Sequence, residues 1–134
     1  MSADACIAAL DNALAQGKSE EIILRRVVGA APNQVNIDVT CIAAVTAATT
    51  EQLAAGIPAT DLNVVLSPTQ INNAQWPGGH VPALPPFDLD QRVPRQITDK
   101  VLLKTRGQQP RAVAFADPSF VGGELVRIDM RISG

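Results

Sequence analysis

Few side chains in this sequence have the types and spacing that catalysis requires. The single histidine, His80, lies in a segment rich in proline and glycine and has no base or nucleophile near it in sequence. Asp88 and Asp90 alternate in FDLD, but irregular chain of this kind favours solvated carboxylates over an acid–base pair. Ser67 precedes a proline in a turn and lacks the strand-to-helix setting of a nucleophile elbow. The sequence therefore predicts a protein that is not an enzyme.

Residues that bind metals, cofactors or stacked bases are equally sparse. Cys6 and Cys41 are too few for a disulfide framework, and no histidine, cysteine or acidic cluster has the paired spacing of a metal site. The glycine turns in GQQPR and VGGE match neither a Walker loop nor a dinucleotide-binding loop. Three Phe and one Trp, with no Tyr, are too few for a face that stacks bases. We expect no cofactor and no metal.

The chain has the length and composition of one globular domain, spanning residues 1–134, and 46% of its residues are hydrophobic. Its charge is unevenly spread: residues 1–90 hold three basic against nine acidic groups, and residues 91–134 hold eight against four. This asymmetry suits a ring in which unlike faces of neighbouring subunits meet, although a scatter of solvated charges explains it equally well. No membrane-spanning stretch or secretion signal is apparent, so we expect synthesis in a cytoplasm and no membrane partner.

The first seventeen residues have the pattern of a short amphipathic helix. Ile7, Leu10 and Leu14 share one face, and Gly17 supplies a stop. A helix with one narrow apolar stripe must dock on another surface. The protein's own β-structure is the first expectation, and a partner subunit is the second.

The remainder of the chain is predicted to form five or six strands. Hydrophobic and polar residues alternate most clearly in 35–45 and 124–133, which is typical of strands with one buried face. The other predicted strands span 20–29, 62–68, 99–105 and 110–116, and a turn is predicted at 117–123. We therefore predict a mainly β fold: a small antiparallel barrel or sandwich with a short N-terminal helix.

Two connections are unusually long. Residues 47–61 join two predicted strands, although a hairpin needs only about two to five residues. A short helical turn at 69–76 then leads into the proline-rich segment 77–94, and Trp76 is expected to cap the core. Candidate contacts with partner subunits are the apolar residues of the helix and of this region: Ile7, Leu10, Leu14, Trp76 and Phe87.

The order of these elements resembles a known family. The resemblance is carried by four stretches, IILRRVVG, VTCIAAVTAATTEQLAAGIPATDLNVVLSPTQI, RVPRQITDKVLLKTRG and DPSFVGGELVRIDMRISG. In this order they resemble the head-tail joining proteins of long-tailed bacteriophages, also called head-closure or stopper proteins. The likeness is to the versions in prophages and gene-transfer-agent-like particles of alphaproteobacteria. No single motif in the series is specific by itself.

The resemblance implies a virion protein that is assembled in the host cytoplasm and forms a ring at the head-tail interface. Such a ring lies below the portal and adaptor, receives the tail terminator or tail tube, and has six copies, with twelve as the alternative. The connection at 47–61 would project into the channel and hold packaged double-stranded DNA, by non-specific steric contact, until the tail signals ejection. The implied plug tip comprises Thr50, Glu51, Gln52, Leu53, Ala54, Ala55 and Gly56, with Gly56 and Pro58 as a candidate hinge.

The composition of the loop is compatible with that role. Small residues let several copies approach one axis, and Glu51 repeated around a ring would repel the phosphates of DNA. The alternative is a loop packed on its own barrel. The N-terminal helix and residues 77–94 look like additions to the family pattern, and the resemblance assigns them no partner. Other candidate functions are an adaptor or tail terminator, a small ligand-binding barrel and a DNA-binding module.

Overall fold

The computed structural model describes residues 2–17, 19–29, 32–77, 90–96, 98–104, 107 and 109–133. Three helices lie within these ranges: α1 (Ala3–Gln16), α2 (Thr50–Ala54) and α3 (Thr69–Ala74). The strands are β1 (Glu20–Val28), β2 (Val35–Ala47), β3 (Leu62–Leu66), β4 (Asp99–Leu103), β5 (Arg111–Val121) and β6 (Glu124–Ile132). His80, Asp88, Phe87 and most of the proline-rich segment lie outside the described residues.

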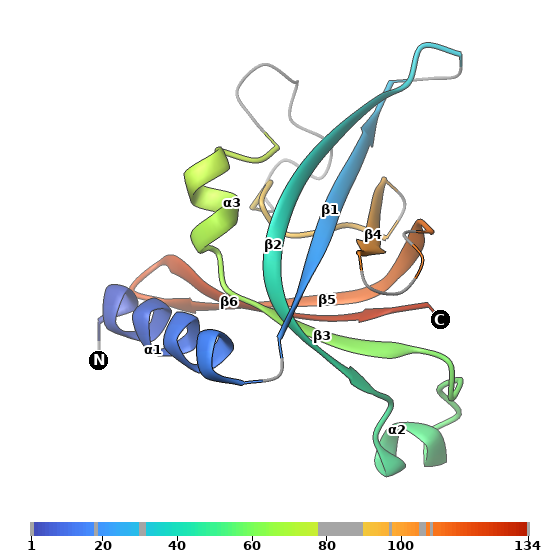
Figure 1. Ribbon diagram of the computed structural model, residues 1–134, viewed down its shortest axis with the longest axis horizontal. Coiled ribbons are helices and arrows are strands. Elements are labelled where there is room, and N and C mark those ends of the chain that lie inside the picture. The colour runs from blue at the N-terminus through green and yellow to red at the C-terminus, as the bar shows by residue number, and fades with distance from the viewer. Residues whose placement is uncertain are drawn as a thin grey trace.

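The strands form a closed antiparallel barrel in the order β1-β2-β3-β6-β5-β4, in which β4 pairs with β1 to complete the circle. Figure 1 shows the strongly bent β2 and β1 crossing over β3, β5 and β6, with α1 and α3 on one side of the barrel. The predicted mainly β fold with a short N-terminal helix is confirmed. Of the two predicted architectures, the barrel is the one that forms, and closure pairs the strand edges that a sandwich leaves open.

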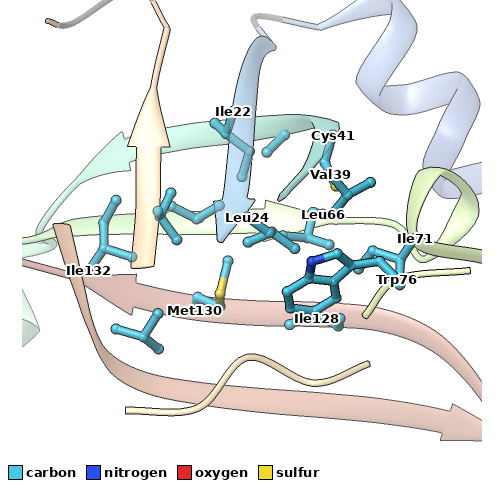
Figure 2. Close-up of a cluster of buried hydrophobic side chains, with 14 of the residues drawn as sticks. Ile22, Leu24, Val39, Cys41, Leu66, Ile71, Trp76, Ile128, Met130 and Ile132 are labelled. Atoms are coloured by element: carbon cyan, nitrogen blue, oxygen red, sulfur yellow. The ribbon is translucent and has the colours of Figure 1, made fainter. Parts of the chain in front are cut away.

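The barrel interior follows the alternation in the strands. Ile22 and Leu24 of β1, with Ile128 and Ile132 of β6, are fully or almost fully buried, and Figure 2 shows their side chains meeting inside the barrel. Cys41 of β2 is also buried, and burial raises the pKa of its thiol to about 12. Aliphatic side chains thus supply most of this core.

One predicted turn is wrong. Residues 117–123 were expected to form a turn, but β5 continues to Val121, and only Gly122 and Gly123 turn the chain. Both glycines have positive φ, +59° and +83°, which a two-residue hairpin requires and other residues rarely adopt. Pro118 is tolerated because β5 pairs with β4 only at Arg111 and Ala112, so further along it has β6 as its single neighbour.

Helix α1 packs on its own barrel, as first expected. The Ser2 hydroxyl accepts a hydrogen bond from the Ala5 N–H at its start, and the helix contacts β6 and β2. Leu14 is buried beneath it, so the prediction that Leu14 contacts a partner is wrong. Ile7 and Leu10 are half-buried, and their predicted partner contacts stay predictions.

A polar contact fixes the position of α1 on the barrel. The Asp11 carboxylate accepts hydrogen bonds from the hydroxyls of Ser67 and Thr69, which flank the junction of β3 and α3. Ser67 is fully buried, so these bonds also satisfy a hydroxyl that has no access to water. Ser67 therefore joins α1 to the junction of β3 and α3.

Candidate functional site

The connection between β2 and β3 is the candidate site. Ala47, the last residue of β2, pairs directly with Leu62, the first residue of β3, so residues 48–61 form an excursion from an otherwise regular hairpin. In Figure 1 this excursion carries α2 and extends away from the barrel at the end of β2 opposite the β1–β2 turn. Helix α2 spans Thr50–Ala54.

Helix α2 begins with a capping box. The Thr49 hydroxyl accepts a hydrogen bond from the Gln52 N–H (3.2 Å), and the Gln52 side-chain oxygen accepts one from the Thr49 N–H (2.8 Å). This reciprocal pair satisfies two amide donors that the first turn leaves without helical acceptors. A helix of five residues cannot persist through propensity alone, so its caps determine whether it forms.

Gln52 also attaches α2 to the barrel. Its amide nitrogen donates to the Asn63 side-chain oxygen (2.9 Å), and the Asn63 amide nitrogen donates back to Gln52 Oε1 (2.7 Å) and to the Ala47 carbonyl (3.3 Å). Sequence reasoning placed Gln52 at the exposed tip. The structure instead places its half-buried side chain at the base, where it joins the loop to β3.

The C-terminal end of α2 is capped by a turn that contains Gly56. The Gly56 N–H donates to the Leu53 carbonyl (3.1 Å) and the Ile57 N–H to the Gln52 carbonyl (3.0 Å), which together form a Schellman motif. This motif needs a left-handed residue, and Gly56 has φ +90°. Gly56 therefore terminates the helix in this conformation, and the hinge proposed for Gly56 and Pro58 stays a prediction.

The tip of the connection is exposed and almost free of charge. Glu51 and Ala54 are exposed, and 45% of the Leu53 surface is accessible to solvent. No basic residue occurs between 47 and 61. The second acidic residue, Asp61, is buried at the base, 3.4 Å from the Arg131 guanidinium. The exposed part thus carries one carboxylate and small or apolar side chains.

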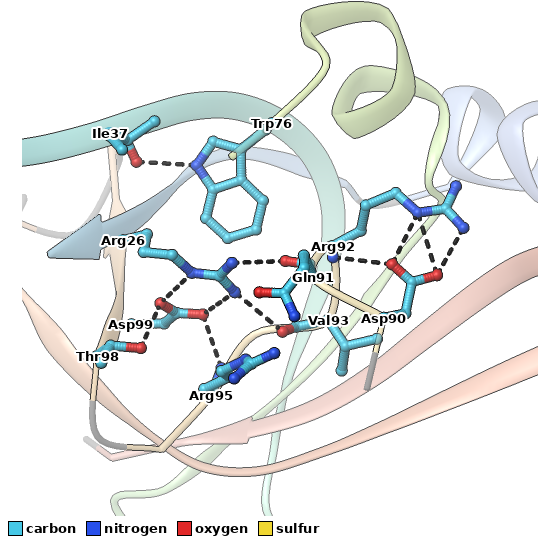
Figure 3. A network of polar contacts seen from close by, with 10 residues as sticks. All are labelled: Arg26, Ile37, Trp76, Asp90, Gln91, Arg92, Val93, Arg95, Thr98 and Asp99. Atoms are coloured by element: carbon cyan, nitrogen blue, oxygen red, sulfur yellow. Dashed lines mark hydrogen bonds and ion pairs between the residues drawn. The ribbon is translucent and has the colours of Figure 1, made fainter. Parts of the chain in front are cut away.

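A second feature of the structure is the anchor formed by Arg26, Asp99 and Trp76. Arg26 and Asp99 are each 1% exposed, and Arg26 donates two hydrogen bonds of 2.9 Å to the Asp99 carboxylate. The guanidinium carbon lies 4.7 Å from the centroid of the Trp76 ring (Figure 3). This geometry combines a bidentate ion pair with a cation–π contact.

The anchor also holds the chain that leads into β4. Arg26 donates to the carbonyls of Gln91 (2.6 Å) and Val93 (3.2 Å), and the Arg95 N–H donates to Asp99 (2.7 Å). Figure 3 shows Gln91, Val93 and Arg95 close to the Arg26–Asp99 pair, with the Asp90–Arg92 pair to one side. The end of the proline-rich excursion is therefore fastened to the barrel by backbone and side-chain hydrogen bonds to buried charges.

Trp76 is not available to a partner. It is 3% exposed, and its indole N–H donates to the Ile37 carbonyl (2.8 Å). The expectation that Trp76 caps the core is confirmed, whereas its prediction as a partner contact is wrong. The reason is that its ring fills the space between the core and Arg26.

Of the paired aspartates considered for chemistry, only Asp90 lies in the described chain. Arg92 donates to its carboxylate (2.6 Å), and this hydrogen bond lowers the Asp90 pKa from its ordinary value. Arg92 also donates to the Asn72 side-chain oxygen (2.7 Å), which joins this segment to α3. Asp90 therefore belongs to a surface ion pair.

A cleft of about 320 Å³ lies on the outside of β3, β6 and β5, beside the base of the β2–β3 connection. Its lining includes Gln52, Asn63, Phe115, Asp117, Asp129 and Arg131. Sequence reasoning did not single out this surface, because its members come from four separate segments. Within the described residues, no three histidine, cysteine or acidic side chains lie close enough together to hold a metal ion.

No family model, curated protein or solved structure matches this chain. No helix in the described part of the chain is both long and apolar enough to cross a membrane.

Proposed function

We propose that this protein is a stopper of a bacteriophage or gene-transfer-agent-like particle. Copies of the barrel would form a ring below the portal and adaptor, and the β2–β3 connection of each copy would point toward the channel axis. The ring would close the channel over packaged DNA and present a surface to the tail terminator or tail tube. Non-specific steric contact with the DNA end would hold the genome until ejection.

The observation that carries the proposal is the construction of the β2–β3 connection. A capped helix stands clear of the barrel at one end, and Gln52 and Asn63 attach its base to β3. This arrangement gives a short element a defined direction without burying it. It disfavours the alternative in which the loop packs along its own barrel, because the tip residues remain exposed.

The chemistry of the tip also suits a plug. DNA carries one negative charge per about 1.7 Å of helix axis, so a basic tip would bind it, whereas Glu51 repels it. Small side chains such as Ala54 allow several copies to approach one axis. A plug of this composition would block the channel by its volume alone, and it would release the DNA without having to break salt bridges to the phosphates.

The other candidate functions have less support. The interior of the barrel is filled by a cluster of packed side chains, which disfavours a ligand site of the kind that wider barrels enclose. A helical adaptor disagrees with a fold that is mainly strand. A tail terminator is the nearest rival, because the strand content that argues against an adaptor does not argue against it.

The direct test replaces the loop and keeps the barrel. Because Ala47 and Leu62 are directly paired, an Asn-Gly turn can replace residues 48–61 as a two-residue hairpin. Particles carrying this variant are expected to assemble a ring and package DNA but to lose the DNA before tails attach. DNase sensitivity of the packaged genome measures the loss.

Two variants control for side effects of the replacement. Asp61→Asn in the intact loop reports the loss of the Arg131 ion pair alone, and Glu51→Gln removes the tip charge at constant volume. Both are expected to retain DNA, because each leaves the obstruction in place. Full retention of DNA by particles that lack residues 48–61 would exclude the plug function.

A further inference from the structure

The outer surface of the barrel holds two like-charge pairs that face each other across neighbouring strands. On β5 and β6, Asp117 lies directly opposite Asp129. Asp129 has a cation of its own, because Arg127 donates to it at 2.9 Å. Asp117 is exposed and has no hydrogen-bond or ion-pair partner within the described chain. Like charges in this position destabilise a sheet unless a counter-charge arrives.

The basic counterpart lies on β1 and β4. Arg25 is directly opposite Lys100, and Arg25 is already paired with Asp38 through hydrogen bonds of 2.9 and 3.0 Å. The hydrogen bond to Asp38 raises the Arg25 pKa, so this residue keeps its charge. Lys100 has no partner among the residues that the structure describes. Each side of the barrel thus carries one charge that no described residue of the chain neutralises.

Apolar side chains accompany both charges. On the acidic side, Phe115 is 53% exposed and lines the cleft of about 320 Å³ together with Asp117. On the basic side, Ile42 is 39% exposed on β2, and Ile23 alternates outward from the buried residues of β1. An exposed aromatic or aliphatic residue beside an unneutralised charge is typical of a protein contact surface.

We propose that these surfaces bind each other in successive copies of this chain. Val65 lies opposite Asp129 on β3 and lines the same cleft. The acidic face (Val65, Phe115, Asp117 and Asp129) of one copy would bind the basic face (Ile23, Arg25, Ile42 and Lys100) of the next, with Asp117 beside Lys100. A second copy is the occupant that the charges favour, because one chain carries both complementary halves on different strands. A contact between unlike faces is heterologous and propagates into a closed ring or a filament.

The contact deepens the proposed function by naming the surfaces that join the ring, and only closure into a ring rests on that function. The purified full-length chain is expected to self-associate in sedimentation velocity, and salt is expected to weaken the association. Asp117→Lys and Lys100→Asp are each expected to weaken it by about tenfold or more. The double variant restores the attraction with reversed sign and is expected to regain most of the affinity.

Folding does not confound this test. Each reversal removes a like-charge pair within the chain, so the thermal unfolding midpoint of either single variant is expected to equal or exceed that of the parent. Glu124→Lys is the matched control for Asp117→Lys, since it makes the same change in net charge at the exposed β5–β6 turn, outside both faces. Its self-association is expected to be unchanged apart from a small non-specific effect.

Several outcomes would overturn the inference. They are a parent chain that stays monomeric at the highest concentration it tolerates, single variants that associate like the parent, and a double variant that stays dissociated. Each of these would leave the plug function open, because DNA retention in particles tests that function separately. Conversely, a restored double variant together with DNA retention in loop-deleted particles would support the contact and exclude the plug.

Discussion

Two connections leave this barrel, and they are held in opposite ways. Residues 90–96 are attached through the buried Arg26–Asp99 pair, whose two side chains are 2% and 1% exposed. At its base, the β2–β3 connection is attached through neutral amides, Gln52 and Asn63, and through the partly exposed Asp61–Arg131 ion pair. Moving residues 90–96 would leave buried charges without partners, whereas moving α2 away from β3 would exchange amide hydrogen bonds for hydrogen bonds to water and leave the Asp61–Arg131 pair in place.

The energetic difference between these attachments separates a fixed segment from one that can move. A buried charge that loses its partner costs about 3–5 kcal/mol, whereas a neutral hydrogen bond contributes about 0.5–1.5 kcal/mol. A channel gate needs the second kind of attachment, because it must be directed at rest and displaced on a signal. We therefore expect residues 90–96 to be rigid and α2 to be able to move.

The largest expected effect comes from breaking the anchor. Arg26→Met is expected to lower the free energy of unfolding by about 3–5 kcal/mol, because it leaves the Asp99 carboxylate buried without its cation. Chemical denaturation measures the loss. The double variant Arg26→Met, Asp99→Asn removes both charges and is expected to recover part of it. A loss below about 1 kcal/mol in the single variant would show that the anchor is not what holds this segment.

The anchor also shows how far the sequence predicts this molecule. Periodicity identified the strands, and it contained an unused signal: Arg26 continues the buried phase of Ile22 and Leu24. Its partner was not predictable, because Asp99 lies 73 residues away and only barrel closure brings β4 beside β1. The extent of β5 was missed because Pro118 is typical of a turn unless its strand is known to have a single neighbour there.

The sequence predicted where the candidate site lies, but it did not predict the contacts that hold it. The length of the connection between two alternating segments located it, and the sequence TTEQ contains the Thr49–Gln52 capping box. The contact of Gln52 with Asn63 depends on how α2 folds back toward β3, which local sequence does not specify. Gln52 was consequently assigned to the tip and belongs to the base.

A smaller effect is expected at the β2–β3 connection. Gln52→Ala removes the capping box and the Asn63 contact and is expected to cost about 1 kcal/mol. Amide hydrogen exchange should become faster in residues 49–57 and stay unchanged in the barrel strands. Equally faster amide exchange in every strand would contradict the expectation that this connection opens independently of the barrel core.

Lowering the pH should weaken the surface ion pair between Asp90 and Arg92 in the 90–96 segment. The hydrogen bond from Arg92 lowers the Asp90 pKa, so this pair contributes stability above the ordinary aspartate pKa of about 3.9. That contribution is lost as the pH falls through the lowered value. NMR shifts of residues 90–96 should report the titration, and Arg92→Gln should move its midpoint upward. An unchanged midpoint would contradict the assignment.

The smallest effect is expected at the exposed tip. Leu53→Ser is expected to change the free energy of unfolding by no more than about 0.5 kcal/mol, because Leu53 is 45% exposed and supports no core contact. Thermal unfolding of the purified chain measures this. A destabilisation above about 1.5 kcal/mol would mean that the tip packs on its own barrel, which is the alternative to a projecting plug.

The most direct test of the central claim is a reconstruction of the neck of DNA-filled particles that carry this protein. We expect α2 of each copy to lie near the channel axis, directly beneath the last density of the DNA, and to leave the axis in emptied particles. Density for α2 on the outside of the ring, with an open channel below retained DNA, would contradict the account.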